Sequence, residues 1–275
     1  MSGGAEEADR SQTRRSHERQ AQLWACLQGV TDPELDESVV DLNFVTKADV
    51  DAENRVHIEF RLPTYWCAAN FSFLMADDMR RAVSALDWVE GVSVVLGEHM
   101  YADKINAGLA EGLSFQETFG VEADGNLDDL RQTFLVKAFQ RRQVALLNHL
   151  TSVGHQPETI VSLTLAELGC LPVDDEGEKL VRRYLERRTV VGPVRADMPA
   201  FVDAAGARLN ADGFATYVSG LRRVGVSAEF NSALCRGLLS VRFDLDTPFV
   251  PKSRTSSPST SHNTIPAPPP PAANF

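Results

Sequence analysis

The sequence predicts an α+β protein in which a small three-stranded sheet is covered by helices over about residues 17–115, followed by a mainly helical second domain. Residues 55–62 alternate strictly between apolar and polar, the period of a strand with one buried face. The segments 39–50 and 91–96 are rich in Val, Leu and Phe, which favour strands. Beyond residue 127 strand signals are few and apolar residues recur at helical spacing.

The elements of the first half follow in the order helix, strand, strand, helix, strand, helix. The polar turn 51–54 joins two of these strands directly, which is typical of an antiparallel hairpin. Thr31-Asp32-Pro33-Glu34 is a turn, because the proline restricts Asp32 to an extended conformation. The predicted helices and strands are residues 17–29, 39–50, 55–62, 71–86, 91–96 and 102–113, with a connector at 115–125.

The second half is expected to begin with a long helix that ends at Gly154, a typical C-terminal residue. Thr164 to Glu167 has the spacing of a capping box, and Asp174 and Asp175 are placed to cap another helix. Further helices are expected at 199–209, 213–224 and 227–239, and a short strand or packed chain end at 241–245. The expected domains are 1–16 (disordered), 17–125 (α+β), 126–250 (mainly helical) and 251–275 (a disordered Ser/Pro-rich tail).

Charge is unevenly distributed along the chain. Residues 1–125 hold 23 acidic and 10 basic residues, whereas residues 126–275 hold 15 and 17. An acidic first half argues against nucleic acid as a partner, because phosphate binding needs a basic surface. No apolar run approaches the roughly 20 residues that span a bilayer, so no membrane association is expected. No secretory signal is evident in residues 1–20, and we expect a cytoplasmic protein with free thiols.

Cys67 falls at the junction between the second strand and the following helix, where we expect it in the first helical turn. Backbone N–H groups and the positive end of the helix dipole favour a thiolate there. A thiolate is both a nucleophile and a metal ligand. The alternative is a buried structural cysteine.

Asp32 and Glu34 are the other candidates for chemistry. Together with Cys67 they are too few for a closed structural zinc site, but iron or an iron–sulfur cluster could bind transiently if a second subunit or client supplied further ligands. The alternative for Asp32 and Glu34 is a turn that only positions the chain. His57 and His99 are expected on the surface or at a sheet edge rather than as ligands, with His99 the fourth candidate after Asp32, Glu34 and Cys67. Cys-x-x-Cys, phosphate-loop and metalloprotease motifs are absent from the sequence.

Residues 20–112 resemble the SufT/PaaD-type iron–sulfur assembly family, which includes the cytosolic iron–sulfur targeting protein. The resemblance rests on the motif 30–34 (Val-Thr-Asp-Pro-Glu), the segment 40–45 (Val-Asp-Leu-Asn-Phe-Val), the alternating strand before Cys67 and the segment 91–94 (Gly-Val-Ser-Val). It implies an α+β domain that helps to mature iron–sulfur or other metalloproteins. Cys67 would be the functional thiol, and Asp32 and Glu34 would match the family's acidic motif.

The chain departs from the family pattern around the cysteine. Pro63 stands where the family usually has Thr, and the aromatic residues Tyr65 and Trp66 replace small or Pro residues. These aromatic residues suit an interface. The long form with Tyr-Trp-Cys and a helical extension is similar to accessory proteins of soluble di-iron monooxygenases.

The sequence and the resemblance together predict a metallocofactor maturation factor that is not an enzyme and has no permanently bound cofactor. Cys67 would hold iron or an iron–sulfur cluster transiently, and a client metalloprotein, such as an iron–sulfur or di-iron oxygenase component, would be bound with help from Asp32, Glu34, Tyr65 and Trp66. One alternative is a non-catalytic adaptor in which Cys67 only packs. Another is a thiol enzyme, which needs a base near the thiol. Pairing of open sheet edges into a homodimer is also compatible with the sequence.

Overall fold

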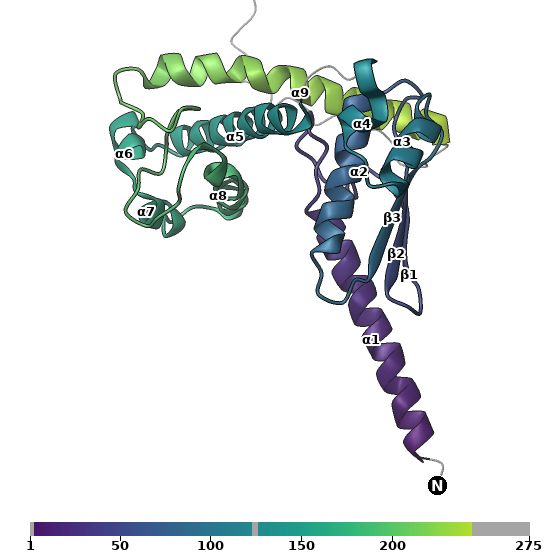
Figure 1. Ribbon diagram of the computed structural model, residues 1–275. Coiled ribbons are helices and arrows are strands. Elements are labelled where there is room, and N and C mark those ends of the chain that lie inside the picture. The colour runs from purple at the N-terminus through teal and green to yellow at the C-terminus, as the bar shows by residue number, and fades with distance from the viewer. Residues whose placement is uncertain (1–2, 123–125, 244–275) are drawn as a thin grey trace, which may run out of the picture.

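The computed structural model describes residues 3–122 and 126–243 of the 275-residue chain. These residues pack around two hydrophobic cores, one between a three-stranded sheet and its helices and one within a helical half. Figure 1 shows the two parts joined by a long helix, α9 (Phe214–Phe243), which runs along the helical half and reaches the sheet. The α+β class with a helical second part is confirmed.

The sheet has the strand order β1-β2-β3, formed by Val45–Val50, Arg55–Phe60 and Gly91–Leu96. β1 and β2 form the predicted antiparallel hairpin, with Val50 opposite Val56. β3 lies parallel to β2, which requires the crossover made by α2 (Ala69–Ser84). Alternate residues of β2 point into the core, as the sequence period predicts: Val56, Ile58 and Phe60 are buried.

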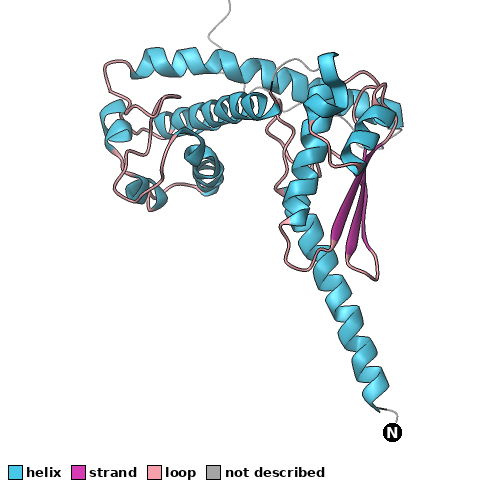
Figure 2. Cartoon of the chain, viewed as in Figure 1, coloured by secondary structure: helices cyan, strands magenta, loops and turns pink. Residues whose placement is uncertain are grey.

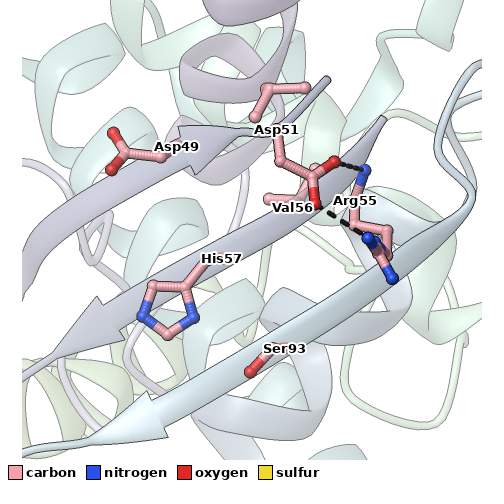
Figure 3. A pocket seen from close by; sticks show the side chains of 7 residues that line it. Asp49, Asp51, Arg55, Val56, His57 and Ser93 are labelled. Carbon is pink, nitrogen blue, oxygen red and sulfur yellow. Dashed lines mark hydrogen bonds and ion pairs between the residues drawn. The ribbon is translucent and has the colours of Figure 1, made fainter. Parts of the chain in front are cut away.

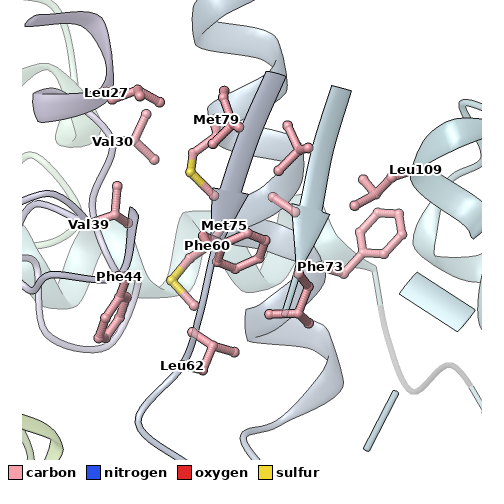
Figure 4. Packing of buried hydrophobic residues seen from close by; sticks show 14 of the residues in the cluster. Leu27, Val30, Val39, Phe44, Phe60, Leu62, Phe73, Met75, Met79 and Leu109 are labelled. Atoms are coloured by element: carbon pink, nitrogen blue, oxygen red, sulfur yellow. The ribbon is translucent and has the colours of Figure 1, made fainter. Parts of the chain in front are cut away.

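Helices cover one face of this sheet. α2 packs against β3, and its buried residues include Phe73, Met75 and Met79. Figure 4 shows Met75 beside Phe60 and Phe73 toward Leu109. The N-terminal helix α1 lies beside α2 (Figure 2). Helix α1 comprises Gly3–Gln28. The remaining helical elements of this part are α3 (Ala102–Ala110), α4 (Phe115–Phe119) and η1 (Gly120–Glu122).

The helical half is built around α5 (Leu127–Ser152), which packs against α8 and α9. Its shorter helices are α6 (Pro157–Ser162), α7 (Leu165–Gly169), α8 (Asp175–Arg188) and η2 (Thr189–Val191). Two predicted caps are confirmed. Thr164 and Glu167 form the capping box of α7, and the side chain of Asp174 accepts the N–H of Gly177 at the start of α8.

The predicted strand at 39–50 is too long, because β1 begins only at Val45. Residues 39–43 form turns, and Asn43 has a φ of 57°. Asn tolerates this left-handed conformation better than most residues. Val39 and Leu42 are nevertheless buried, so their apolar character reflects packing of a turn and not a strand.

The predicted disorder of residues 1–16 is wrong for the residues that the structure describes, because α1 extends from Gly3. Half of residues 1–16 are Ala, Glu, Arg or Gln, and all four are good helix formers. Arg14 and Glu18 form an ion pair of 3.5 Å, one turn apart. A charged, weakly apolar segment therefore has the composition of an exposed helix as well as that of a disordered chain.

The predicted helix at 199–209 is also wrong. This segment forms turns with isolated β-bridges from Thr164 to Pro199 and from Val202 to Arg208, and Gly206 has a φ of 82°. The helices predicted at 213–224 and 227–239 are one continuous helix, α9, which also includes residues 241–243. Residues 244–245 and the predicted tail 251–275 lie outside the described residues.

Candidate functional site

Cys67 lies in the loop 61–68, between β2 and α2. The expectation of a first-turn position is corrected: α2 begins at Ala69, with Ala68 as its N-cap in an extended conformation (ψ 130°). Pro63 and the polar residues after Phe60 end the strand early and delay the helix. The Cys67 side chain is half-buried, and its Sγ lies 3.0 Å from the Thr64 hydroxyl. This contact fixes the position of the Cys67 thiol within the loop, and the thiol remains partly exposed to solvent.

His99 holds the Cys67 backbone in place. The imidazole Nδ1 accepts the N–H of Tyr101 (3.1 Å), so the Nε2–H is the atom that donates to the Cys67 carbonyl oxygen (2.8 Å). Burial lowers the pKa of His99, although the bond to Cys67 acts in the opposite direction. The expectation of a surface or edge residue is corrected, since His99 is only 5% exposed. His99 is therefore a positioning residue for the loop.

An exposed apolar patch borders Cys67. We call Tyr65, Trp66 and Met100 the apolar patch; their exposed fractions are 52%, 72% and 48%. The Met100 N–H donates to the Tyr65 carbonyl (2.9 Å), which joins the two loops that carry the patch. Large exposed apolar side chains gathered on one surface are suited to binding another protein.

Asp32 is buried, and its side chain stabilises the turn through hydrogen bonds to the backbone. One carboxylate oxygen, Oδ1, accepts the N–H groups of Glu34 (2.9 Å) and Leu35 (2.8 Å). Burial raises the pKa of Asp32 to about 6, against the opposing effect of these two hydrogen bonds. The turn alternative for Asp32 is thus supported by its geometry.

The other acids of this turn face the helical half. Glu34 accepts from Asn231 through its side chain (2.9 Å) and from Arg141 through its carbonyl (2.6 Å). Asp36 is buried between two cations, with Arg142 at 2.5 Å and Arg187 at 3.0 Å. Glu37 binds Ser232 and Arg236 of α9. The acidic turn, residues 32–37, is therefore the docking point for α5, α8 and α9.

Cys235 lies near this region, and no motif in the sequence points to it. It lies on α9, is half-buried and packs against the same core as Cys67. Burial raises the pKa of Cys235 to about 11, and the charges of Asp32, Cys67, Glu34 and Glu37 add to this effect. Two of the chain's four cysteines thus share one acidic environment, although no local spacing in the sequence links them.

The exposed face of the sheet carries a hollow. Figure 3 shows it at the β1–β2 turn, lined by Asp49, Asp51, Arg55, His57 and Ser93. Asp51 accepts from the Arg55 backbone (2.8 Å) and side chain (3.1 Å), which closes the hairpin. His57 lies on the polar strand face as expected and contacts Glu59 (3.0 Å). These groups are accounted for by the turn, and the hollow carries no chemistry of its own.

Across residues 3–122 and 126–243, no group of three or more His, Cys, Asp or Glu side chains is arranged to hold a metal ion. The same part of the chain contains no helix long and apolar enough to cross a bilayer. Asp32, Glu34 and Cys67 are thus brought to one region, but they do not form a ready metal centre.

Comparison with known families places part of the chain in an iron–sulfur assembly context. Residues 20–94 match the family model described as iron-sulfur cluster assembly protein. The match includes the acidic turn, β1, β2, Cys67 and α2, and it ends within β3, before the helical half begins. No curated protein matches the chain. The match supports a role in iron–sulfur cluster assembly or maturation.

Proposed function

We propose that this protein is a maturation factor that passes iron or an iron–sulfur cluster to a client metalloprotein and is not itself an enzyme. The observation that carries the proposal is Cys67, which sits in a loop of the iron–sulfur assembly domain directly beside the apolar patch. A half-buried thiol beside a binding surface can meet a client's ligands without leaving its own fold. The cargo would be held transiently, since the chain supplies few ligands.

Each side chain around the thiol has a distinct part in this role. Cys67 supplies the thiolate, the soft ligand that iron–sulfur clusters require. Thr64 can donate its hydroxyl hydrogen to that sulfur, and His99 fixes the backbone behind it. The only hydrogen-bond partner of Cys67 Sγ among the described contacts is the Thr64 hydroxyl, which is a poor base, so a nucleophilic thiol enzyme receives no support.

The client would be recognised through the apolar patch. Tyr65 and Trp66 offer large, stiff side chains of the kind that dominate binding energy at interfaces. An iron–sulfur or di-iron oxygenase component, encountered in the cytoplasm, is the client class that we propose. Asp32 and Glu34 would act indirectly, by holding the acidic turn against the helical half.

The experiment is to replace Cys67 by Ser and to measure the iron and sulfide content of the metalloprotein that copurifies with the chain from its native cells. We expect the metal content of that client to fall while its binding to the chain persists. Cys170→Ser is the matched control, because Cys170 is an exposed cysteine of the helical half. A fully loaded client in cells that carry folded Cys67→Ser protein would refute the proposal.

A non-catalytic adaptor is the second candidate, and the exposure of Trp66 favours it. At 72% exposed, this side chain has little packing role and is available to a partner. Trp66→Ala should weaken client capture, with Phe230→Ala on the exposed face of α9 as the control. If client capture depends on Trp66 while client metal content is independent of Cys67, the adaptor function replaces the maturation function.

A further inference from the structure

The C-terminal half of α9 carries apolar side chains on two sides of the helix. Leu239 packs into the core beside the sheet and is 2% exposed. On the other side, Phe230, Leu234, Leu238 and Val241 are 39–85% exposed. Because these four residues recur at spacings of three and four, they form one continuous line along the helix, which we call the α9 stripe.

The described residues leave the α9 stripe uncovered. A helix that is buried on one side normally has a polar outer face, whereas a helix with apolar residues all round is buried on every side. Gly237 lies between Leu234 and Val241 on the same side, and a Cβ added there would meet no other element within 4 Å. Ala would favour the helix more than Gly at such an open position. The stripe therefore has the form of a surface that a further segment covers closely.

The size of the stripe argues for an occupant from the same chain and against a second copy. A stable interface between separate proteins uses about 20–30 residues on each side. Four side chains on one helix are far fewer, so two copies would associate only weakly through them. A segment joined to α9 by a short linker is present at high effective concentration. An adjoining apolar segment would thus occupy the stripe ahead of a second copy.

The sequence directly after α9 supplies such a segment. α9 ends at Phe243, just beyond the stripe, and residues 244–250 read Asp-Leu-Asp-Thr-Pro-Phe-Val. Pro248 disfavours a continuation of the helix, and Asp and Pro both favour turns. Phe249 and Val250 follow as an apolar pair. This order of residues suits a reverse turn followed by a short apolar segment that runs back along the helix.

The length of this segment matches the length of the stripe. If residues 244–247 form the turn, the next three residues span about 10 Å when extended, at roughly 3.3 Å per residue. About the same distance separates Val241 from Leu234 along the axis of α9, at a rise of about 1.5 Å per residue. Phe249 and Val250 would therefore lie against the stripe between these two positions.

We propose that residues 244–250 fold back on α9 and cover the α9 stripe, with Phe249 and Val250 against Leu234 and Leu238. The covering segment would bury the second apolar side of the helix and remove it from solvent. The inference goes beyond the proposed function, because it concerns a different surface and does not require metal or client binding.

The covering segment also has a consequence for the candidate site. Arg242, in the last turn of α9, donates to the carbonyl oxygens of Leu62 (3.2 Å) and Glu98 (2.9 Å). Leu62 belongs to the 61–68 loop, which carries Cys67. A segment that holds the end of α9 in place would thus also steady this loop.

The test is hydroxyl-radical footprinting of the full-length chain, with the oxidation of Leu234 and Leu238 read by mass spectrometry. Phe249→Asp places a charge in the covering segment, so both leucines should oxidise several-fold faster in this variant than in the wild type. Ile265→Asp is the matched control, because it introduces the same charge further along the chain and should leave both rates unchanged. Unchanged circular dichroism shows that each variant is folded.

The footprint is recorded at low and at high protein concentration to distinguish the possible occupants. We expect wild-type rates that do not depend on concentration and that rise in Phe249→Asp. Wild-type rates that rise on dilution to those of Phe249→Asp would identify a second copy as the occupant and would overturn the proposal. Equal rates in the wild type and Phe249→Asp would also overturn it. Neither result bears on the maturation function, which the metal content of the client tests separately.

Discussion

At the residue scale, the polar side chains around Cys67 are held by hydrogen bonds within the protein. Asp32 satisfies two backbone N–H groups, and both nitrogens of His99 are engaged. The thiol of Cys67 differs, because its described hydrogen-bond partner is a rotatable hydroxyl, which would be able to turn away in the metal or client binding that we propose. Rigid neighbours around one adaptable thiol are what a transfer site requires.

Asp32 allows a pH-dependent test of its role as a turn residue. Its folded pKa of about 6 lies above the ordinary value of 3.8, so ionisation costs stability, and the cost grows as the pH rises from about 4 to 6 and is complete above that range. Asp32→Asn keeps an oxygen acceptor for Glu34 and Leu35 but removes the buried charge. We expect Asn to match or exceed the wild type at pH 8, by up to about 3 kcal/mol, and to lose this advantage near pH 4.

The measurement is urea unfolding of both proteins at pH 4, 6 and 8. Asp32→Ala is the comparison variant, because it lacks the acceptor and should be destabilised at every pH. A large loss of stability for Asp32→Asn at pH 8 would show that the negative charge itself is needed.

At the scale of elements, the unit that matters is the strand β2, the 61–68 loop and the helix α2. The alternation of Val56, Ile58 and Phe60 predicts the strand, and Phe73, Met75 and Met79 lie on the buried face of the helix. Their burial fixes the ends of the loop, so the position of Cys67 follows from packing on both sides of it. The apolar patch is exposed because the same loop turns its aromatic side chains outward.

The contact of α3 with α4 offers a test at this scale, because the two helices approach closely at Gly108. A Cβ at this position would lie 2.2 Å from the Thr118 hydroxyl oxygen and 3.0 Å from its Cβ. We expect Gly108→Ala to destabilise the protein by about 1–3 kcal/mol despite the better helix propensity of Ala. Thermal unfolding should show the loss.

The same site supplies its own control. Adding Thr118→Ala to Gly108→Ala removes the clashing atoms, so the double variant should recover part of the lost stability. Equal melting temperatures for Gly108→Ala and the wild type would contradict the close packing of α3 on α4.

The sequence predicts those elements whose signal is local. The hairpin, α2, β3, α5 and the caps at Thr164 and Asp174 all follow from period or capping chemistry. The turn at 39–43 does not, because Val39 and Leu42 are buried by tertiary contacts that resemble a strand in composition. Cys235 could not be assigned to the site at all, since its position depends on where α9 docks.

At the scale of the whole molecule, the helical half is a second layer locked onto the acidic turn. Asp36 lies between Arg142 and Arg187, and its φ of 53° places it in the left-handed region. Arg142 is itself buried and also binds Glu186 (2.6 Å). The acids of the turn thus join the two cores of the molecule.

Removing the buried ion pairs of Asp36 with Arg142 and Arg187 should lower the stability of the entire fold. Asp36→Asn preserves the tolerance of the left-handed conformation but removes the buried carboxylate of Arg142, which then keeps only the more exposed Glu186. Loss of one partner from a buried pair costs about 3–5 kcal/mol, so chemical unfolding should shift strongly to lower denaturant. Asp197→Asn, which removes an exposed partner of Arg195, should leave the transition unchanged. Equal transitions for the two variants would contradict the lock.

The most direct test of the account is transfer of iron–sulfur cargo from this chain to the client. Anaerobically loaded protein is mixed with the metal-free client that copurifies with it, and the iron and sulfide gained by the reisolated client are measured. We predict transfer from the wild type and from Cys170→Ser, and a loss of transfer from folded Cys67→Ser. Transfer from Cys67→Ser at the wild-type rate would contradict the central role of Cys67.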